Sequence, residues 1–296
     1  MWLHRYAVLL ACCTLFLVVA GALVTSHEAG LSVPDWPLSY GKLMPEMEGG
    51  IFYEHGHRMI ATTVGFLTII LAVWLWRAEP RPWLKKLGWA ALGAVIFQGL
   101  LGGMTVIFML PKPVSVSHAC LAQLFFSTIV AISWFTSAAW RRGGTLVEDQ
   151  GAPGLRSLAV AASGSLFLQL ALGAATRHKA FGVTPHVLGA VLATGMVLWL
   201  IVRILLRHGN HQGLVRPALA LLAITFSQVF LGVAAYMSRL ATADAPQPMP
   251  VMIGFTVVHV AVGALTLATS VIVAIQVFRF VQPEPAVSGA RVPVAS

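Results

Sequence analysis

The sequence predicts an all-α membrane protein whose eight transmembrane helices form two pseudo-symmetric four-helix bundles, with the N- and C-termini in the cytoplasm. Three observations lead to this prediction. Eight apolar segments are long enough to cross a bilayer, which takes about 20 residues. Only 10% of the 296 residues are charged and 58% are hydrophobic, whereas a soluble domain carries roughly 25% charged residues. The segments also repeat one pattern of residues, four helices after four helices.

The eight apolar segments are separated by connections that contain polar residues, proline or glycine. They lie near residues 6–26, 58–77, 87–108, 115–138, 155–175, 186–206, 217–237 and 252–280. The first has no small-x-small cleavage site followed by a polar chain, so we expect a retained helix rather than a signal peptide. No Arg- and Ser-rich transit sequence precedes it, which favours a bacterial plasma (inner) membrane over an organelle.

The basic residues predict the orientation of these helices. Of the 19 Lys and Arg residues, 13 fall in segments on the side of the N-terminus and 6 on the other side. Basic residues concentrate in cytoplasmic loops, so both termini are expected there. The formal net charge of +9 therefore reflects membrane topology and predicts lipid neighbours, not a nucleic-acid partner. The six outer basic residues are Lys42, Arg58, Lys112, Arg177, Lys179 and Arg239.

The two halves of the chain look like copies in the same orientation. In each, a glutamine precedes a glycine by four residues, follows one histidine by 41 or 42 residues, and precedes a second histidine by 20 or 31 residues. The longer gap predicts an insertion of about 11 residues in the last outer loop. The residues are His57, Gln98, Gly102 and His118 in the first copy and His186, Gln228, Gly232 and His259 in the second.

This repeat predicts four parts of the chain. Residues 1–142 form an N-terminal four-helix half, residues 143–154 a cytoplasmic linker, residues 155–281 a C-terminal four-helix half, and residues 282–296 a cytoplasmic tail. Four-helix bundles commonly build cofactor sites from side chains on facing helices. One site is therefore expected in each half.

Four histidines lie near the start of the second, fourth, sixth and eighth segments, and so near the outer face: His57, His118, His186 and His259. Ligand-forming side chains inside spanning helices are costly and indicate function. Two facing pairs of histidines are what two haem irons require as axial ligands. Any single one could instead be a hydrogen-bonded core residue, but the shared position favours iron ligation by the set.

Cys12, Cys13 and Cys120 lie in apolar segments and predict no disulfide framework.

The segment Glu54–Arg58 offers further chemistry at the first histidine. Glu54 and His57 are three residues apart and share one helical face. A carboxylate beside a haem edge can move protons. The alternative is a surface ion pair between Glu54 and Arg58, four residues on, and both interpretations can hold. Arg58 and Arg177 are candidates to bind haem propionates, with simple snorkelling to the interface as the alternative.

In these residues the whole chain resembles the haem A synthase family. The resemblance rests on the Gly-Leu-Ser-x-Pro-Asp-Trp-Pro loop at 30–37, the Glu-x-x-His-Arg start at 54–58, and one histidine opening each later even helix. It implies that His186 and His259 hold a b-type haem in the C-terminal half. It also implies that His57 and His118 bind the substrate, haem O, in the N-terminal half, and that Glu54 is catalytic.

The resemblance further implies an oxidoreductase that converts the C8 methyl of haem O into a formyl group by successive hydroxylations and loss of water. Electrons would pass through the b-type haem to a quinone or another acceptor. A haem O synthase would be a partner, and a homo-oligomer is also open. Many members carry a cysteine pair in the first outer loop, where this chain has Val33 and Ser39. A thiol–disulfide step there is unavailable to this chain.

Two other functions compete with this one. The first is a di-haem, quinol-linked electron-transfer cytochrome, which predicts symmetric sites and no need for Glu54. The second is a haem-binding chaperone or exporter without redox turnover. The position three residues before His186 is Val183, whereas the position three before His57 is Glu54. This asymmetry favours the enzyme.

Overall fold

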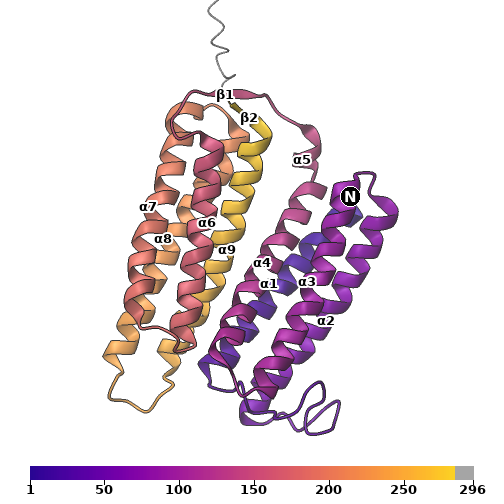
Figure 1. Ribbon diagram of the computed structural model, residues 1–296, viewed down its shortest axis with the longest axis vertical. Coiled ribbons are helices and arrows are strands. Elements are labelled where there is room, and N and C mark those ends of the chain that lie inside the picture. Colours follow the sequence, from indigo (N-terminus) through magenta and orange to yellow (C-terminus); the bar gives the residue numbers. More distant parts are fainter. Residues whose placement is uncertain (284–296) are drawn as a thin grey trace, which may run out of the picture.

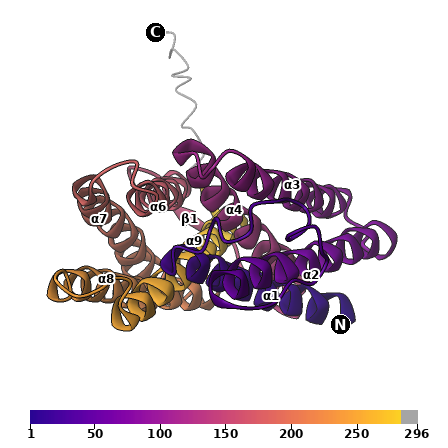
Figure 2. The ribbon, with the colours of Figure 1, turned by 90° about the horizontal axis from the view of Figure 1, so that it is seen from below.

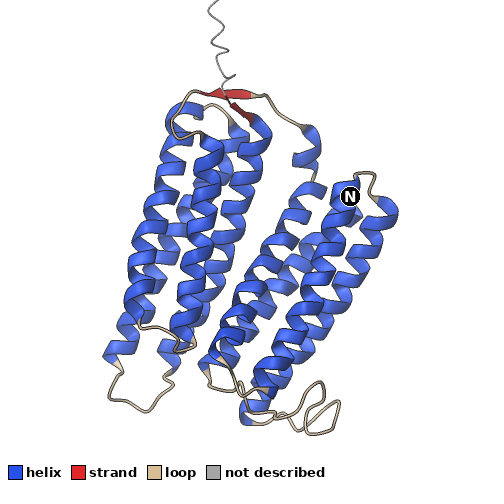
Figure 3. Ribbon diagram, viewed as in Figure 1, coloured by secondary structure: helices blue, strands red, loops and turns tan. Residues whose placement is uncertain are grey.

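The computed structural model describes residues 1–283 and consists mainly of long helices (Figure 3). Eight helices in this range are long and apolar enough to cross a membrane, which confirms the predicted all-α membrane protein. They are α1 (Trp2–Ser26), α2 (Gly49–Ala78), α3 (Pro82–Ile107), α4 (Lys112–Thr136), α6 (Leu155–Arg177), α7 (Val183–His208), α8 (Gln212–Ala241) and α9 (Pro250–Phe280). A short helix, α5 (Ala138–Arg142), and two strands, β1 (Val147–Asp149) and β2 (Val281–Pro283), complete the described chain.

The long helices pack in two groups of four that lie side by side (Figure 1). Helices α1–α4 contact one another in the first group, and α6–α9 in the second. The groups meet where α9 packs on α1 and α4, and where α4 packs on α6, as the end-on view also shows (Figure 2). Val18, Phe126, Ala264 and Ala268 form a buried apolar cluster at this junction. Each group thus has an interior of its own.

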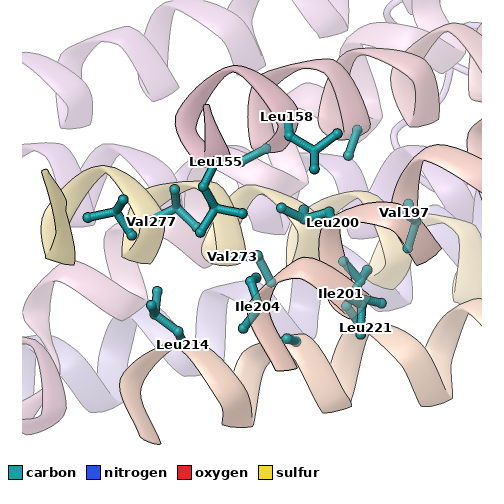
Figure 4. Close-up of a cluster of buried hydrophobic side chains, with 14 of the residues drawn as sticks. Leu155, Leu158, Val197, Leu200, Ile201, Ile204, Leu214, Leu221, Val273 and Val277 are labelled. Carbon is teal, nitrogen blue, oxygen red and sulfur yellow. The ribbon is translucent and has the colours of Figure 1, made fainter. Parts of the chain in front are cut away.

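The buried apolar core of each group lies toward the end that carries the N-terminus. In the C-terminal group it comprises the first turns of α6 and α8 and the last turns of α7 and α9, as the labelled side chains in Figure 4 show. The N-terminal group follows the same rule, with core residues from Ala7 and Leu10 of α1 to Ile129 and Ile132 of α4. All four conspicuous histidines lie at the opposite end, beyond these cores.

Helices α2 and α8 extend furthest beyond the bounds that the sequence pattern predicts. Helix α2 begins at Gly49, nine residues before the predicted 58, so Glu54 and His57 lie inside the helix and not at its start. The segment before 58 contains aromatic and aliphatic residues and no proline, so nothing in it stops a helix. The first outer loop is correspondingly shorter, 27–48. The eleven extra residues of the second copy are shared between the end of α8, the connection to α9 and the start of α9.

Helix α8 begins at Gln212 and continues through Pro217, where the prediction placed its start. Proline has no N–H to donate to the carbonyl four residues earlier, which here belongs to Gly213. The side chain of Gln276 on α9 donates to that carbonyl at 3.0 Å. Gln276 also accepts a hydrogen bond from Trp134 Nε1 on α4 at 3.2 Å. One buried amide therefore satisfies the interrupted helix and joins the two halves.

The linker between the halves is held by specific contacts. Strand β1 pairs in parallel with β2, the continuation of α9. Asp149 accepts hydrogen bonds from the backbone of Gly151 and Leu155, the first residue of α6, and forms a 3.1 Å ion pair with Arg203. Most of the predicted tail, 284–296, lies outside the described residues.

Candidate functional site

Each of the four histidine rings rests on a glycine of the preceding long helix. A Cβ atom at Gly21, Gly102, Gly173 or Gly232 would lie only 3.1, 3.2, 2.8 or 2.9 Å from the Cε1 atom of the facing ring. The facing histidines are His57, His118, His186 and His259, in that order. Small residues let a helix approach its neighbour closely, and here the space is taken by imidazole. The glycine–histidine contact thus occurs four times, once on each pair α1–α2, α3–α4, α6–α7 and α8–α9.

The two rings of the C-terminal half face each other across a distance that suits a shared iron. The ring centroids of His186 and His259 are 6.3 Å apart and the ring planes are nearly perpendicular, at 88°. Imidazole nitrogens bind metals at about 2 Å, so two rings on opposite sides of one iron have centroids about 6 Å apart. The pair therefore fits the axial positions of a haem, whose macrocycle supplies the other iron ligands.

Two further observations agree with this fit. The buried Nδ1 atoms of His57, His118 and His259 have no hydrogen-bond partner among the described residues, although buried polar atoms are normally satisfied. Within residues 1–283, no three His, Cys, Asp or Glu side chains gather as ligands of a bare metal ion. A group that needs only two protein ligands, such as haem iron, matches this set of donors.

Three glutamines contact the histidines, and sequence reasoning gave them no role at the site. The Gln98 amide nitrogen lies 3.3 Å from His118 Nε2 and donates to the His118 carbonyl at 3.0 Å. The Gln169 amide nitrogen lies 2.9 Å from His186 Nδ1 and donates to the His186 carbonyl at 2.9 Å. The sequence repeat includes Gln98 but does not include Gln169. The signal was present, since Gln169 precedes Gly173 by four residues, as Gln98 precedes Gly102.

The third glutamine makes the same approach on the last pair of helices. The Gln228 amide nitrogen lies 3.4 Å from His259 Nε2. Gln228 precedes Gly232 by four residues, so in each case the amide and the glycine occupy one face of one helix. In three of the four helix pairs, α3–α4, α6–α7 and α8–α9, the histidine is therefore contacted by a Gln-x-x-x-Gly motif of the first helix.

Glu54 is buried and ion-paired. Its carboxylate accepts a hydrogen bond from Arg58 at 2.6 Å and another from the backbone N–H of Val33 at 2.8 Å. Only 5% of the Glu54 side chain and 16% of the Arg58 side chain are exposed. The alternative of an i, i+4 ion pair is thus present, but inside the protein and not on its surface. The pair stands on the turn of α2 that carries His57, with no carboxylate at the equivalent Val183.

Arg58 ties the first outer loop to α2. Its guanidinium donates to the carbonyl oxygens of Asp35 at 2.7 Å, Leu38 at 2.8 Å and Val33 at 3.3 Å. His55 adds a contact of 2.7 Å between its Nδ1 and Ser39 Oγ. Because these bonds converge on one helical turn, the loop is fixed against the start of α2.

The Pro-Asp-Trp-Pro part of this loop is ordered by its own contacts. The Asp35 carboxylate accepts from the backbone N–H groups of Tyr40 at 2.7 Å and Gly41 at 2.9 Å. These hydrogen bonds hold the pKa of Asp35 below its usual value of 3.8, and the bond from Gly41 has the largest effect. The Trp36 ring packs on Gly103 of α3, where a Cβ would approach it to 2.7 Å. The loop thus reaches α3 one residue from Gly102, on which His118 rests.

Arg177, the second predicted propionate partner, lies at the outer end of α6 between the two halves. It donates to Ser26 Oγ at the end of α1 at 3.0 Å. The next residue, His178, is half-buried, and burial lowers its pKa below the usual 6.5, with the charge of Arg177 acting in the same direction. Cys12, Cys13 and Cys120 are free thiols. The outer end of α6 therefore carries a partly buried cation beside a half-buried imidazole whose pKa is lowered.

Comparison with known proteins decides the family. A model of the COX15-CtaA family, described as a cytochrome oxidase assembly protein, matches residues 4–51 and 46–281. The chain belongs to the COX15-CtaA family. Its resemblance to haem A synthases, inferred from the loop and histidine motifs, is thereby confirmed at the level of the family.

Similar curated proteins come from bacteria. A "Heme A synthase" of Symbiobacterium thermophilum is 32% identical over 170 residues, which is 55% of this chain and 55% of that protein. A "Heme A synthase" of Alkalihalophilus pseudofirmus is 31% identical over 134 residues, 44% of this chain and 45% of that protein. The chain thus matches about half the length of these relatives. Eight spanning helices and bacterial relatives place the COX15-CtaA member described here in a bacterial plasma membrane.

Proposed function

We propose that this protein is a haem A synthase, an oxidoreductase that converts the C8 methyl group of haem O into a formyl group. Each of two hydroxylations adds the oxygen of a water molecule to that carbon and releases two protons and two electrons. The resulting geminal diol loses water to give the formyl group. The reaction therefore requires a base beside the methyl carbon, a fixed macrocycle and an electron acceptor.

The observation that supports this proposal is the difference between two otherwise similar histidine pairs. Only the N-terminal pair has a buried carboxylate on the same helical turn, Glu54 beside His57. In the proposal His57 and His118 bind the iron of haem O, and Glu54 takes up protons released from the methyl carbon. Arg58 holds that carboxylate in place through a 2.6 Å hydrogen bond.

His186 and His259 would hold a resident b-type haem through its iron. Such a haem supplies one-electron transfer when it is bound. The histidine spacing of 6.3 Å supports the assignment, as do Gly173 and Gly232, which seat the rings. Because α9 packs on α1 and α4, the C-terminal site adjoins the N-terminal group and is suited to receive electrons from it.

Arg58 and Arg177 are the proposed partners of the haem propionates. Arg58 directly follows His57, and Arg177 lies one turn after Gly173 at the outer end of α6. Guanidinium groups bind carboxylates through paired hydrogen bonds, which for Arg58 requires that it exchange its bonds to loop carbonyls for bonds to the propionate. A haem O synthase is the proposed supplier of substrate, and a quinone or another acceptor would take the electrons.

One observation favours a second candidate, a di-haem electron-transfer cytochrome. The glycine–histidine contact is repeated with nearly the same geometry in both halves, as two permanent haem sites would require. This candidate gives Glu54 no role. The two functions therefore make opposite predictions for a substitution at this one position.

The test is to express the chain with a haem O synthase, extract the haems from membranes and separate them by chromatography. We expect haem A from the wild type, and haem O or a hydroxylated intermediate from Glu54→Gln, which keeps the shape of the side chain but removes its charge. Glu48→Gln is the matched control, because Glu48 is an exposed glutamate directly before α2. This variant should form haem A as the wild type does.

Unconverted haem O in the wild type would contradict the proposal. If that protein also contained two molecules of haem B with low-spin spectra, the electron-transfer cytochrome would be favoured. Haem A at the wild-type level in Glu54→Gln would leave the synthase standing but remove the role of Glu54.

A further inference from the structure

Of the four helices whose glycine contacts a histidine, α3, α6 and α8 carry a Gln-x-x-x-Gly motif and α1 does not. Gln98, Gln169 and Gln228 each precede the glycine beneath a histidine by four residues. On α1, the residue four before Gly21 is Leu17. Leu17 is a partly buried member of the apolar core of the N-terminal group. His57 is therefore seated on its glycine like the other three histidines, but no amide is available at the corresponding place.

The three amides are well placed to fix the rings that they contact. Gln98 and Gln169 donate to the main-chain carbonyl of their histidine and also lie against one ring nitrogen. An amide anchored in this way resists rotation of the imidazole. Partners of the second ring nitrogen set the orientation and tautomer of histidine ligands, and losing them typically costs about 10- to 100-fold in metal affinity.

The amides of the C-terminal half are further confined by glycines on the opposite helices. A Cβ at Gly263 would lie 3.0 Å from the Gln228 amide nitrogen, and a Cβ at Gly189 would overlap the Gln169 amide. Both glutamines of this half are thus enclosed between two helices. In the N-terminal half one histidine is braced, His118, and the other, His57, has a glycine on one side and no amide.

We propose that Gln98, Gln169 and Gln228 are positioning residues for the histidine ligands, and that His57, whose helix partner α1 carries Leu17 at the position of the amide, is the ligand that releases to let a haem enter and leave. The structure thereby assigns the two halves different kinetics. Both ligands of the C-terminal site are braced, so its haem is retained. One ligand of the N-terminal site is unbraced, so its haem exchanges, as a substrate and its product must. The role of haem exchange in this inference rests on the proposed function, whereas the test below does not require haem O to be converted.

The test measures haem loss, not haem conversion. The full-length chain is purified in detergent and loaded with haem B, and transfer of the haem to excess apomyoglobin is followed by absorbance. His57→Ala/His118→Ala isolates the C-terminal site, and His186→Ala/His259→Ala isolates the N-terminal site. Electron paramagnetic resonance of the low-spin ferric form reports the mutual orientation of the two imidazoles in each.

In the isolated C-terminal site, we expect Gln169→Leu and Gln228→Leu to speed haem loss about 10-fold or more and to shift the resonance g values. Without further substitutions, the isolated N-terminal site should lose haem faster than the isolated C-terminal site. Leu17→Gln should then slow haem loss from the N-terminal site by a similar factor. Gln123→Leu is the control, because Gln123 is a buried glutamine of α4 outside the three motifs. It should leave rates and spectra unchanged.

Equal loss rates from the two isolated sites, or glutamine variants that behave like Gln123→Leu, would overturn the inference. Leu17→Gln keeps the test decisive if a glutamine variant does not fold, because a loss rate unchanged by the added amide also contradicts it. Failure of the proposed function gives a different result: haem O remains unconverted in the extraction experiment, while the loss rates still differ between sites.

Discussion

The histidine pairs of the two halves are built alike at their base and differ in what surrounds them. Both seat imidazoles on glycines at the outer end of a four-helix group, beyond the packed core. The C-terminal pair is enclosed by amides and glycines. The N-terminal pair has a buried ion pair, Glu54–Arg58, and an ordered loop over it. The comparison teaches that a repeated glycine–histidine frame can differ in chemistry through the neighbours of its histidines, while the histidines themselves stay the same.

The largest expected effect comes from Arg58→Ala, which removes the tie peculiar to the N-terminal half. The buried carboxylate of Glu54 would lose its charged partner, and the carbonyls of Asp35 and Leu38 would lose a donor. Breaking one partner of a buried ion pair costs about 3–5 kcal/mol. We therefore expect a markedly lower melting temperature of the purified protein and loss of haem from the N-terminal site, with the C-terminal site still loaded.

The matched control is Lys179→Ala, which breaks a 3.8 Å ion pair with Glu28. The side chains of Lys179 and Glu28 are 85% and 75% exposed. Exposed pairs contribute about 0–1 kcal/mol, so its melting temperature should barely change. Equal shifts in the two variants would show that the loop is not held by Arg58.

The second prediction concerns the glycines beneath the histidines of the C-terminal half, which are changed in Gly173→Ala or Gly232→Ala. The new methyl group would lie 2.8 or 2.9 Å from the Cε1 atom of His186 or His259 and push the ring from its place. We expect haem affinity of this site to fall by about 10-fold or more, measured by titration with haem B, while the N-terminal site is unchanged.

Gly164→Ala on α6 is its control, because nothing lies within 4 Å of the added methyl. Alanine is favoured over glycine inside helices by roughly 0.5–1 kcal/mol, so this variant should bind haem normally and be equally or slightly more stable. If Gly173→Ala bound haem as tightly as Gly164→Ala, the glycine seat would have no role.

The smallest effect concerns the pH at which the loop over the N-terminal pair opens. Hydrogen bonds from Gly41 and Tyr40 lower the pKa of Asp35 in the folded protein. A carboxyl group with a lowered pKa adds stability above its unfolded value, here 3.8, and this stability is lost as pH falls through the folded value. Pepsin should therefore begin to cut within residues 27–48 only below pH 3.8.

Asp35→Asn should make this loop cleavable throughout the range from about pH 2 to 5. Asp244→Asn, in the outer connection between α8 and α9, should leave cleavage of the first loop unchanged. A cleavage profile in Asp35→Asn that follows the wild type would show that the carboxylate does not order the loop.

The sequence was sufficient for the number and approximate course of the spanning helices, because length and apolarity alone decide whether a segment can cross a bilayer. The repeat also marked the four histidines. The sequence did not predict the helix ends correctly. Helix α2 starts nine residues before the predicted residue 58, and α8 continues through Pro217, where its start was predicted. The Gly213 carbonyl freed by that proline is satisfied by Gln276, 63 residues away, which no local pattern reveals.

What the sequence by itself determined is therefore the class of protein, the two-fold repeat and the residue types able to bind iron. Tertiary structure decided which of them meet. Gly21 and Gly173 became part of the site only because α1 and α6 pack against α2 and α7, and Gln169 only because its amide reaches the main chain of His186. Apolarity and periodicity act along the chain, whereas helix–helix contacts depend on the relative rotation of separate helices. That rotation is fixed by packing of the whole bundle.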